Sequence, residues 1–488
     1  MHTDVSAASV LATRRGKQIL ALLCAVAFLD FVDAAIVNVA LPSIRRDLGF
    51  SVQNLQWVLS GYLLTYGGFM LLGGRAADLL GRRRVLLAGT SLFMVSSMIA
   101  GAASTDVMLV GARLAQGAGA AMMIPSALSI LTTTFTHGPD RHKAFGAWGA
   151  MAGLGSTAGV FLGGVISEGP GWRWVFFVNL PVCVAALVAT VRLVPGERER
   201  VRITNFDTAG AVLATAGMLL LVYAVVDAPD TGWGATRTIL ELAIAGALLA
   251  AFALNELRHR NPLFPFSILR INGLAAADAT QVIAMAGFYA MFFFITLYMQ
   301  NVLGYSQIQA GAAYVPTTLG VAVAAGVASQ LFVRTGTRPI IVGGALISAG
   351  AVFWLSRIPA HGSYLRDLLA PLVIMSLGLG AVFVGVTTAA NAGVPADKAG
   401  LAAALVNAST WLGGALGLAI FSAISTSRAQ DLLAAHASRP EALTSGFQRA
   451  LVACSGFLLA AAVIALRATN TRGELAPLIE PVPAPEPA

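Results

Sequence analysis

The sequence is short of charged residues, which make up 11% of its 488 positions, whereas hydrophobic residues make up 57%. Its mean hydropathy is +0.77. A soluble domain carries about 25% charged residues, so this chain cannot cover a water-facing surface. It must use lipid as solvent, where only helices and closed barrels satisfy the backbone. Long apolar runs without alternation then favour an all-α polytopic membrane protein.

Cysteine and histidine are also scarce. The three cysteines lie apart in apolar runs and offer neither a disulfide framework nor a metal-ligand spacing. The six histidines fall in expected loops or near span ends, and no P-loop or nucleophile–base pairing appears. These absences argue against a polytopic enzyme and an ATP-driven pump. We expect no enzymatic activity, no metal and no cofactor.

The net charge of +8 raises the question of nucleic acid. The basic residues, however, sit in short clusters between apolar runs, as the positive-inside rule predicts for membrane proteins. We therefore expect the lipid bilayer as a partner and no nucleic acid.

Fourteen apolar stretches approach the roughly 20 residues that a helix needs to span a bilayer. They lie near residues 18–41, 54–74, 85–103, 107–130, 144–167, 174–194, 208–227, 238–256, 273–300, 308–332, 339–356, 366–390, 399–424 and 448–467. The first has no cleavage signature and is expected to be retained.

An even number of spans places both termini on one side of the membrane. Loops on the side of the N-terminus hold more than twice as many arginines and lysines as the opposite loops. The chain is therefore expected to be a multi-pass protein of the inner (plasma) membrane with cytoplasmic termini.

The chain repeats weakly at a shift of 255 positions. Lys143 falls on Lys398, Gly81 on Gly336, Arg83 on Arg338 and Gly159 on Gly414. Two parallel halves around a central path are typical of many carriers. We expect a cytoplasmic segment 1–17, a six-helix lobe 18–196, two inserted helices 197–260, a six-helix lobe 261–470 and a disordered Pro-rich tail 471–488.

The first span, FLDFVDAAIVNVALP at 28–42, contains two acids, Asp30 and Asp33. From its helical rise, Asp33 lies roughly 12 Å below the outer end of its span, and Arg113 lies roughly 9 Å below the outer end of the fourth. The two side chains can meet if these spans are neighbours. An aspartate at a span centre costs about 2.5–3.5 kcal/mol, so such charges usually face a partner or a wet cavity.

Asp30 and Asp33 share one helix face, and two neighbouring carboxylates do not both ionise easily. A carboxylate that holds either a proton or a cationic ligand couples the movement of the two. The 255-residue shift places both acids and Arg113 on apolar residues of the second half. Structural alternatives stay open: Asp33 bonding a neighbouring helix, Asp30 as polar lining, and Arg113 as a static counter-ion.

Two further segments stand out. GGRAADLLGRRR at 73–84 joins glycines to an acid and a basic cluster, which favours a gating loop over a simple basic anchor; its residues of interest are Gly74, Asp78, Gly81, Arg82 and Arg83. GLGSTAGVFLGG at 153–164 carries a glycine stripe for close helix packing, with a hinge or leak-control role as the alternative. The stripe and its neighbour comprise Gly155, Gly159, Gly163 and Gly164.

Taken together, these motifs resemble the major facilitator superfamily, specifically its fourteen-spanner drug:proton antiporter branch. VDAAIVNVALP resembles the branch's first-span motif, with Asp33, Asn38 and Pro42 matching. The segment 74–83 is similar to the superfamily's loop motif, and RLAQG at 113–117 to its fourth-span motif. In span five, Gly159 precedes a valine where the family has proline.

The resemblance implies alternating access between two lobes and proton-driven export of amphipathic, often cationic drugs, with the proton gradient as energy source. Small-molecule substrates and protons would be its partners, and it would act as a monomer. Export of a native secondary metabolite and uptake of a metabolite are the alternatives. The expected substrate pathway is lined by Asn38, Trp57, Tyr62, Gln116, Asp278, Gln281, Phe288, Tyr289 and Phe292.

Overall fold

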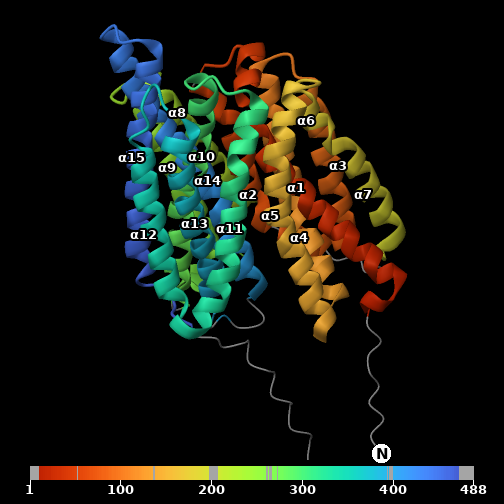
Figure 1. The fold of residues 1–488 in the computed structure, drawn as a ribbon. Helices are drawn as coiled ribbons and strands as arrows, with labels where there is room; N and C mark the ends of the chain where they lie inside the picture. The colour runs from red at the N-terminus through yellow and green to blue at the C-terminus, as the bar shows by residue number, and fades with distance from the viewer. Residues whose placement is uncertain are drawn as a thin grey trace, which may run out of the picture.

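The computed structural model describes residues 10–51, 53–135, 138–196, 207–259, 262, 266–271, 273–392, 394 and 399–471. Figure 1 shows these residues as a bundle of long helices that run in one general direction, with the N-terminal end below. In this part of the chain every regular element is helical. The expected tail lies outside the described residues except for its first position.

The first half of the bundle begins with a 3-10 turn and the long first helix. Its elements are η1 (Val10–Ala12), α1 (Arg14–Leu48), η2 (Asn54–Gln56), α2 (Trp57–Leu80), α3 (Arg82–Gly101), α4 (Asp106–Thr134), α5 (Gly138–Glu168), α6 (Trp174–Phe177) and α7 (Asn179–Leu193). Two helices follow, α8 (Thr208–Thr231) and α9 (Thr236–Arg258). The second half comprises η3 (Phe266–Arg270), α10 (Leu274–Asn301), α11 (Gln307–Thr335), α12 (Thr337–Leu355), η4 (Tyr364–Leu368), α13 (Leu369–Asn391), α14 (Ala399–Ala434) and α15 (Arg439–Ala465).

Within the described residues, 13 helices are long and apolar enough to cross a membrane. The 24-residue helix α2, which carries the expected span near 54–74, is not among them. The exact count of fourteen therefore stays a prediction.

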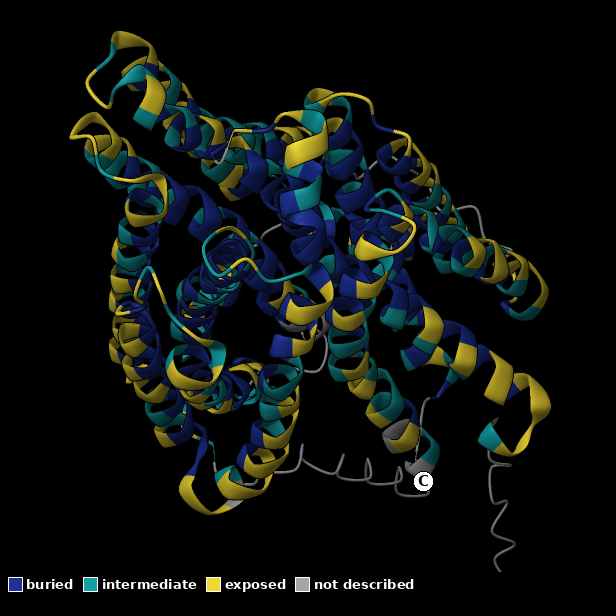
Figure 2. Ribbon diagram, turned by 45° about the horizontal axis from the view of Figure 1, so that its top comes forward, coloured by how far each residue is buried: buried dark blue, intermediate teal, exposed yellow. Residues whose placement is uncertain are grey.

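Large apolar side chains face outward on these helices. Val107, Val323 and Val463 are each at least 60% exposed, and Figure 2 shows exposed positions on the periphery around a buried interior. Water would disfavour such a surface, whereas lipid tails solvate it. The arrangement is that of a multi-pass membrane protein.

The helices pack mainly within two groups. Helices α1–α7 contact one another, and so do α10–α15; we call these groups the N-terminal and C-terminal lobes. The pair α8 and α9 packs together, and α8 touches α2 and α14. The lobes meet mainly through α2 with α14 and α5 with α11. A strict division into six plus six spans stays a prediction.

The two lobes repeat a local backbone feature that the 255-residue shift aligned. Gly81 separates α2 from α3 with φ 97°, and Gly336 separates α11 from α12 with φ 89°. A side chain at such positive φ is strained, so glycine is the residue that permits this abrupt junction. Equivalent turns thus join equivalent helices in the two lobes.

The glycine stripe of α5 packs against α1. A Cβ atom added at Gly155, Gly159 or Gly163 would lie within 3.0 Å of the α1 backbone or side chains. Gly164 faces a different neighbour, because its Cβ would meet the backbone of Gln307 in α11. Three of the four glycines therefore hold α5 close to the helix that carries the buried acids, and the fourth lies at the contact between lobes.

Four hydrogen bonds between described residues join the lobes in the half of the bundle away from the N-terminus. Asn38 donates to Thr296 at 2.6 Å, and Gln300 donates to the Val39 carbonyl at 2.9 Å. The other two bonds run from Gln307 to Ser43 and from the Ile308 amide to Glu168. The C-terminal ends of α1 and α5 are thus attached to α10 and α11.

The close packing of the α5 glycine stripe can be tested with one substitution in the stripe and a control substitution on the same helix. Gly159→Ala introduces a methyl group 2.7 Å from the Val32 carbonyl, and overpacking of this kind should lower the free energy of unfolding by about 1–3 kcal/mol. Gly149→Ala makes the same change on the same helix, with no atom within 4 Å. Thermal unfolding of the purified variants in detergent should show a lower midpoint for the first only; equal midpoints would contradict the packing argument.

Candidate transport site

The carboxylate of Asp33 forms a fully buried salt bridge with Arg113. Arg113 Nη1 lies 2.7 Å from Asp33 Oδ2, and both side chains have zero exposure. The α1 and α4 positions were expected to lie at similar depth, and the structure confirms that they meet. Arg113 also donates through Nε to the Val58 carbonyl at 2.9 Å, and its guanidinium lies 4.2 Å from the Tyr62 ring centroid.

Two amides complete the hydrogen bonding of Asp33. Gln116 and Asn179 donate to its Oδ1 at 2.8 and 2.6 Å. The same amides donate to Ser97 Oγ, at 3.1 and 2.9 Å. Helices α1, α3, α4 and α7 therefore converge on one ion pair, and the surrounding hydrogen bonds offset part of the cost of burying it.

Asp30 has a different environment, one helical turn away. Tyr62 and Tyr66 donate their hydroxyl protons to its Oδ1 and Oδ2, each at 2.8 Å. Asp30 is 1% exposed and forms no ion pair with any described residue. The two acids share a helix, but one is bound by a guanidinium and amides and the other by two tyrosine hydroxyls.

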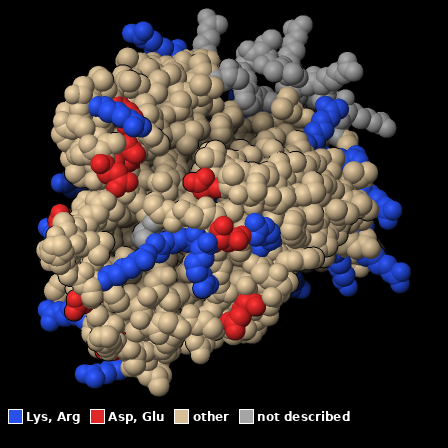
Figure 3. Space-filling view, turned by 90° about the horizontal axis from the view of Figure 1, so that it is seen from above, with Lys and Arg blue, Asp and Glu red and all other residues tan. Residues whose placement is uncertain are grey.

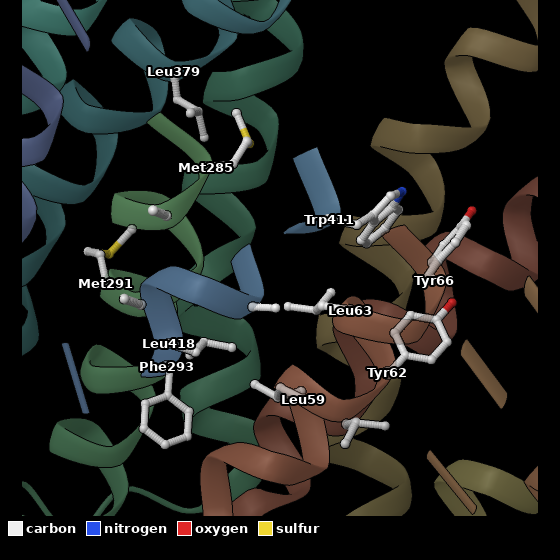
Figure 4. Packing of buried hydrophobic residues seen from close by; sticks show 14 of the residues in the cluster. Leu59, Tyr62, Leu63, Tyr66, Met285, Met291, Phe293, Leu379, Trp411 and Leu418 are labelled. Carbon is white, nitrogen blue, oxygen red and sulfur yellow. The ribbon is translucent and has the colours of Figure 1, made fainter. Parts of the chain in front are cut away.

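The tyrosines that bind Asp30 also touch the opposite lobe. Tyr66 stacks on Trp411 of α14 with ring centroids 4.3 Å apart and an angle of 21° between planes. Figure 4 shows Trp411 beside Tyr66, with Tyr62 on the next turn of α2. The Tyr62 ring meets Trp411 edge-on, with centroids 6.3 Å apart. A chain of direct contacts thus runs from Asp30 to the C-terminal lobe.

The aromatic residues expected in α10 lie along the same interface. Tyr289 approaches Trp411 with ring centroids 6.1 Å apart, and Phe292 packs on Tyr314 at 4.0 Å. Phe288 lies 6.0 Å from Phe292. All three α10 side chains are half-buried.

Trp57 lies away from this group. Its ring centroid is 6.5 Å from that of Tyr223 in α8. Its contact is therefore with the inserted pair of helices, because the start of α2 turns toward α8.

Asp278 and Gln281 form a polar cluster with α14 inside the C-terminal lobe. Gln281 donates to Thr410 at 2.9 Å, and Ser409 donates to Asp278 Oδ1 at 3.5 Å. Asp278 Oδ2 and Gln281 Oε1 are buried and have no hydrogen-bond partner among the residues that the structure describes. Both unsatisfied atoms are acceptors, so the cluster is suited to a group that donates hydrogen bonds.

The segment 73–84 adopts the expected tight junction at Gly81. Arg83 donates to the Val191 carbonyl of α7 at 2.8 Å, and a Cβ on Gly74 would make an ordinary contact with Pro125. Arg82 begins α3. The Asp78 side chain lies outside the described residues, so its gating role stays a prediction.

Several residues of the site were not predicted from the sequence. Asn179 lies near the end of the aromatic and apolar segment WRWVFFVNLP at 172–181. Trp174 is 53% exposed, but Trp172 is buried and donates to Asp47 at 3.0 Å. The sequence features that could have indicated these site residues are the polar Asn179 inside that apolar run and the polar Ser97 inside α3. Nothing in the sequence indicated that Tyr66 and Trp411 would stack.

The structure has two lobes of lipid-exposed helices and an ion pair buried between its first and fourth long helices. These features are typical of a membrane transporter. The chain belongs to the Major Facilitator Superfamily, whose model matches residues 23–418. It is 37% identical to the puromycin resistance protein of Streptomyces alboniger over 94% of this chain and 92% of that one. It is 38% identical to the cephamycin export protein of Amycolatopsis lactamdurans over 91% of each chain.

The fold is also similar to that of solved transporters. A bacterial homologue of the human lysosomal transporter Spinster, solved in an inward-facing and unoccupied conformation, superposes with a TM-score of 0.65. The match covers 93% of this chain and 97% of that one at 16% identity, and supports the fold alone. As a member of this family, the protein is a multi-pass transporter of small molecules, not an enzyme.

Because Asp33 and Arg113 form an ion pair, we expect the effects of replacing them on the free energy of unfolding to be strongly non-additive. Arg113→Gln leaves the Asp33 carboxylate buried without its cation and should lower the free energy of unfolding by about 3–5 kcal/mol. Adding Asp33→Asn removes that charge and should restore much of the loss. Denaturant unfolding of both single variants and the double variant measures the coupling.

The exposed ion pair between Asp47 and Arg173 is the control for this comparison of single and double variants. Its side chains are 46% and 41% exposed, so Asp47→Asn should cost no more than about 1 kcal/mol. A double variant as unstable as the sum of its two single variants would contradict direct coupling between Asp33 and Arg113.

Proposed function

We propose that this protein exports amphipathic antibiotic-type compounds across the plasma membrane in exchange for protons. The puromycin resistance and cephamycin export proteins cover more than nine-tenths of the chain at 37% and 38% identity, which supports drug export. The tetracenomycin C resistance and export protein of Streptomyces glaucescens adds to that support, at 35% identity over 82% of the chain.

Asp30 is our candidate for the residue that carries the transported proton. Asp33 already has a guanidinium and two amides as donors, which is a complete environment for an ionised carboxylate. Asp30 has two hydroxyl donors and no cationic partner within the described part of the chain, so its negative charge is uncompensated there in a buried position. Binding a proton or a cationic substrate removes that cost. A substrate cation and a proton then compete for one carboxylate.

The observation that carries this proposal is the contact of Tyr66 with both Asp30 and Trp411. An ionised Asp30 accepts a hydrogen bond from each tyrosine hydroxyl. When one oxygen gains a proton it becomes a donor, and the tyrosine facing it must turn its hydroxyl or move away. Because the Tyr66 ring is stacked on the opposite lobe, this rearrangement acts directly on the contact that must change for the lobes to rock.

Asp33 and Arg113 then serve as the fixed part of the coupling site. The pair attaches α1 to α4 inside the N-terminal lobe, so the helix that carries Asp30 moves with that lobe. Half-buried Phe288, Tyr289 and Phe292 of α10 supply an apolar and aromatic surface on the other side of the pathway. A ligand with an apolar body and an amine fits such a surface.

We also propose cytoplasmic termini and a monomeric transporter. The support for the orientation is the excess of arginine and lysine in the loops on the side of the N-terminus. In this orientation, the hydrogen bonds between Asn38 and Thr296 and between Gln300 and Val39 lie in the outer half of the bundle.

Replacing the membrane acids tests the exchange. In everted vesicles that accumulate a cationic dye under an imposed pH gradient, Asp30→Asn should abolish gradient-driven transport, because its amide cannot bind and release the proton. Tyr66→Phe should reduce transport without abolishing it, because Tyr62 still donates to Asp30. Asp47→Asn, on an exposed part of the same helix, should transport as the unmodified protein does.

Three results would count against the assignment. Full gradient-driven transport by Asp30→Asn would exclude Asp30 as the coupling residue, and full transport by Asp33→Asn would make the ion pair dispensable for coupling. Dye movement in the direction of uptake would favour the alternative of a metabolite uptake carrier.

The C-terminal cluster makes a separate prediction about substrate charge. Asp278→Asn removes an acceptor that has no cationic partner among the described residues, and we expect a higher apparent KM for a cationic dye with little change for a neutral substrate. Thr280→Ala is the control on the same helix, because the Thr280 hydroxyl is bonded to its own Ala276 carbonyl. Equal effects of Asp278→Asn on both substrates would indicate a structural role for this cluster.

A further inference from the structure

A basic cavity of about 470 Å³ lies between the lobes, at the end of the bundle away from the N-terminus. Arg45 and Arg46 reach it from the last turn of α1, and Arg439 from the first residue of α15. Phe50, Asn301 and Leu443 complete much of the wall. In Figure 3, which views this end of the molecule, basic side chains form a band near the middle of the face.

The positive charges of the cavity are not neutralised by the described residues. None of the three arginines forms a salt bridge there, and no described carboxylate lines the cavity. The nearest acids along the chain are engaged elsewhere. Asp47 accepts hydrogen bonds from Trp172 and Arg173, and Glu441 accepts from Ser438.

Arg45 and Arg46 make only partial use of their donors. Arg45 donates through Nε to the Phe50 carbonyl at 3.3 Å, and Arg46 donates through Nη2 to Ser43 at 3.2 Å. Each guanidinium carries five N–H donors, so several remain available. Arg45 is also half-buried, which reduces the screening of its charge by solvent.

The cavity brings like charges together across the two lobes. Arg45 and Arg46 belong to the N-terminal lobe, whereas Arg439 belongs to the C-terminal lobe. Arg439 moreover occupies the first turn of its helix, where the helix dipole disfavours a cation. Closing the lobes at this end therefore gathers positive charge, and separating them relieves the repulsion.

We propose that this cavity binds an anion of the phosphate or carboxylate class, which bridges the two lobes and stabilises the conformation that is closed at this end. Planar guanidinium groups bind the oxygens of such anions in bidentate fashion. Bound between Arg45, Arg46 and Arg439, the anion replaces the repulsion between the lobes with attraction to both. The inference rests on the proposed alternation of the lobes, but not on the direction of transport or on proton coupling.

Calorimetric titration with inorganic phosphate tests the site directly. The purified protein should bind phosphate, and Arg439→Gln and Arg46→Gln should each weaken binding at least several-fold. Arg449→Gln is the matched control, because Arg449 lines another arginine-containing cavity that lies within the C-terminal lobe. Undiminished binding by both Arg439→Gln and Arg46→Gln would overturn the proposal, as would equal loss in all three variants.

Distance measurement by pulsed EPR tests the conformational effect. Val107 and Leu365 are 77% and 76% exposed, and lie in opposite lobes at this end. Spin labels on Val107→Cys and Leu365→Cys, with Cys24, Cys183 and Cys454 replaced by alanine, report how far the lobes have separated. Phosphate at ten times its Kd should raise the ratio of closed to open populations by about elevenfold if it binds the closed form alone. If chloride at equal ionic strength causes the same shift, the effect is general screening of the repulsion between the arginines, and the proposed anion site is refuted.

Two vesicle compositions separate the sources of the anion. If a lipid headgroup occupies the site, phosphate should bind more weakly in vesicles that contain phosphatidylglycerol than in pure phosphatidylcholine; if the occupant is a free anion, the affinities should agree. Either result supports an anion site, whereas absence of phosphate binding in both overturns it. If the protein binds phosphate but moves no dye, the anion site is supported and the proposed export function is refuted. If it moves dye but binds no phosphate, the export function is supported and the anion site is refuted.

Discussion

Burying the carboxylate of Asp33 and the guanidinium of Arg113 inside a lipid-exposed bundle costs several kcal/mol for each ion. The N-terminal lobe is organised around offsetting that cost. Asn179, Gln116 and Ser97 bring three more polar groups to the pair from α7, α4 and α3. Four helices must keep their rotation and depth for these bonds to form, so the ion pair defines the internal geometry of the lobe. The glycines of α5 then let a fifth helix approach α1 closely.

Because the ion pair fixes the geometry of the N-terminal lobe, the second acid, Asp30, is the one whose environment can change. Asp30 lies on the helix that the ion pair holds, but its partners are tyrosines that touch the other lobe. A change of protonation inside the ion pair would have to disturb the whole lobe, whereas a change at Asp30 disturbs one hydroxyl and one aromatic stack. The structure thus separates a stabilising acid from an adaptable one within a single helical turn, and this separation underlies the proposed exchange mechanism.

The C-terminal lobe repeats the scaffold without the ion pair. Its helices pair in the same pattern as those of the first lobe, and Gly336 repeats the positive φ of Gly81. Where the N-terminal lobe has Arg113, the 255-residue shift gives Leu368, which is buried. Two buried acceptor atoms of this lobe, Asp278 Oδ2 and Gln281 Oε1, instead have no donor among the described residues. The repeated fold supports movement of the lobes, and the unequal polar groups supply the chemistry.

Features that depend on spacing along one helix, or on depth in the bilayer, were determined by the sequence alone. The helical rise was enough to bring Asp33 and Arg113 to one level, and glycine periodicity was enough to define a close-packed stripe. Features that depend on which helix lies opposite were decided only by the tertiary structure. Asn179 meets Asp33, and Tyr66 stacks on Trp411, because helices distant in sequence are neighbours at particular rotations. Trp57 faces α8 for the same reason. Periodicity specifies the faces of a helix, but the choice of partner for each face is a property of the whole packed bundle.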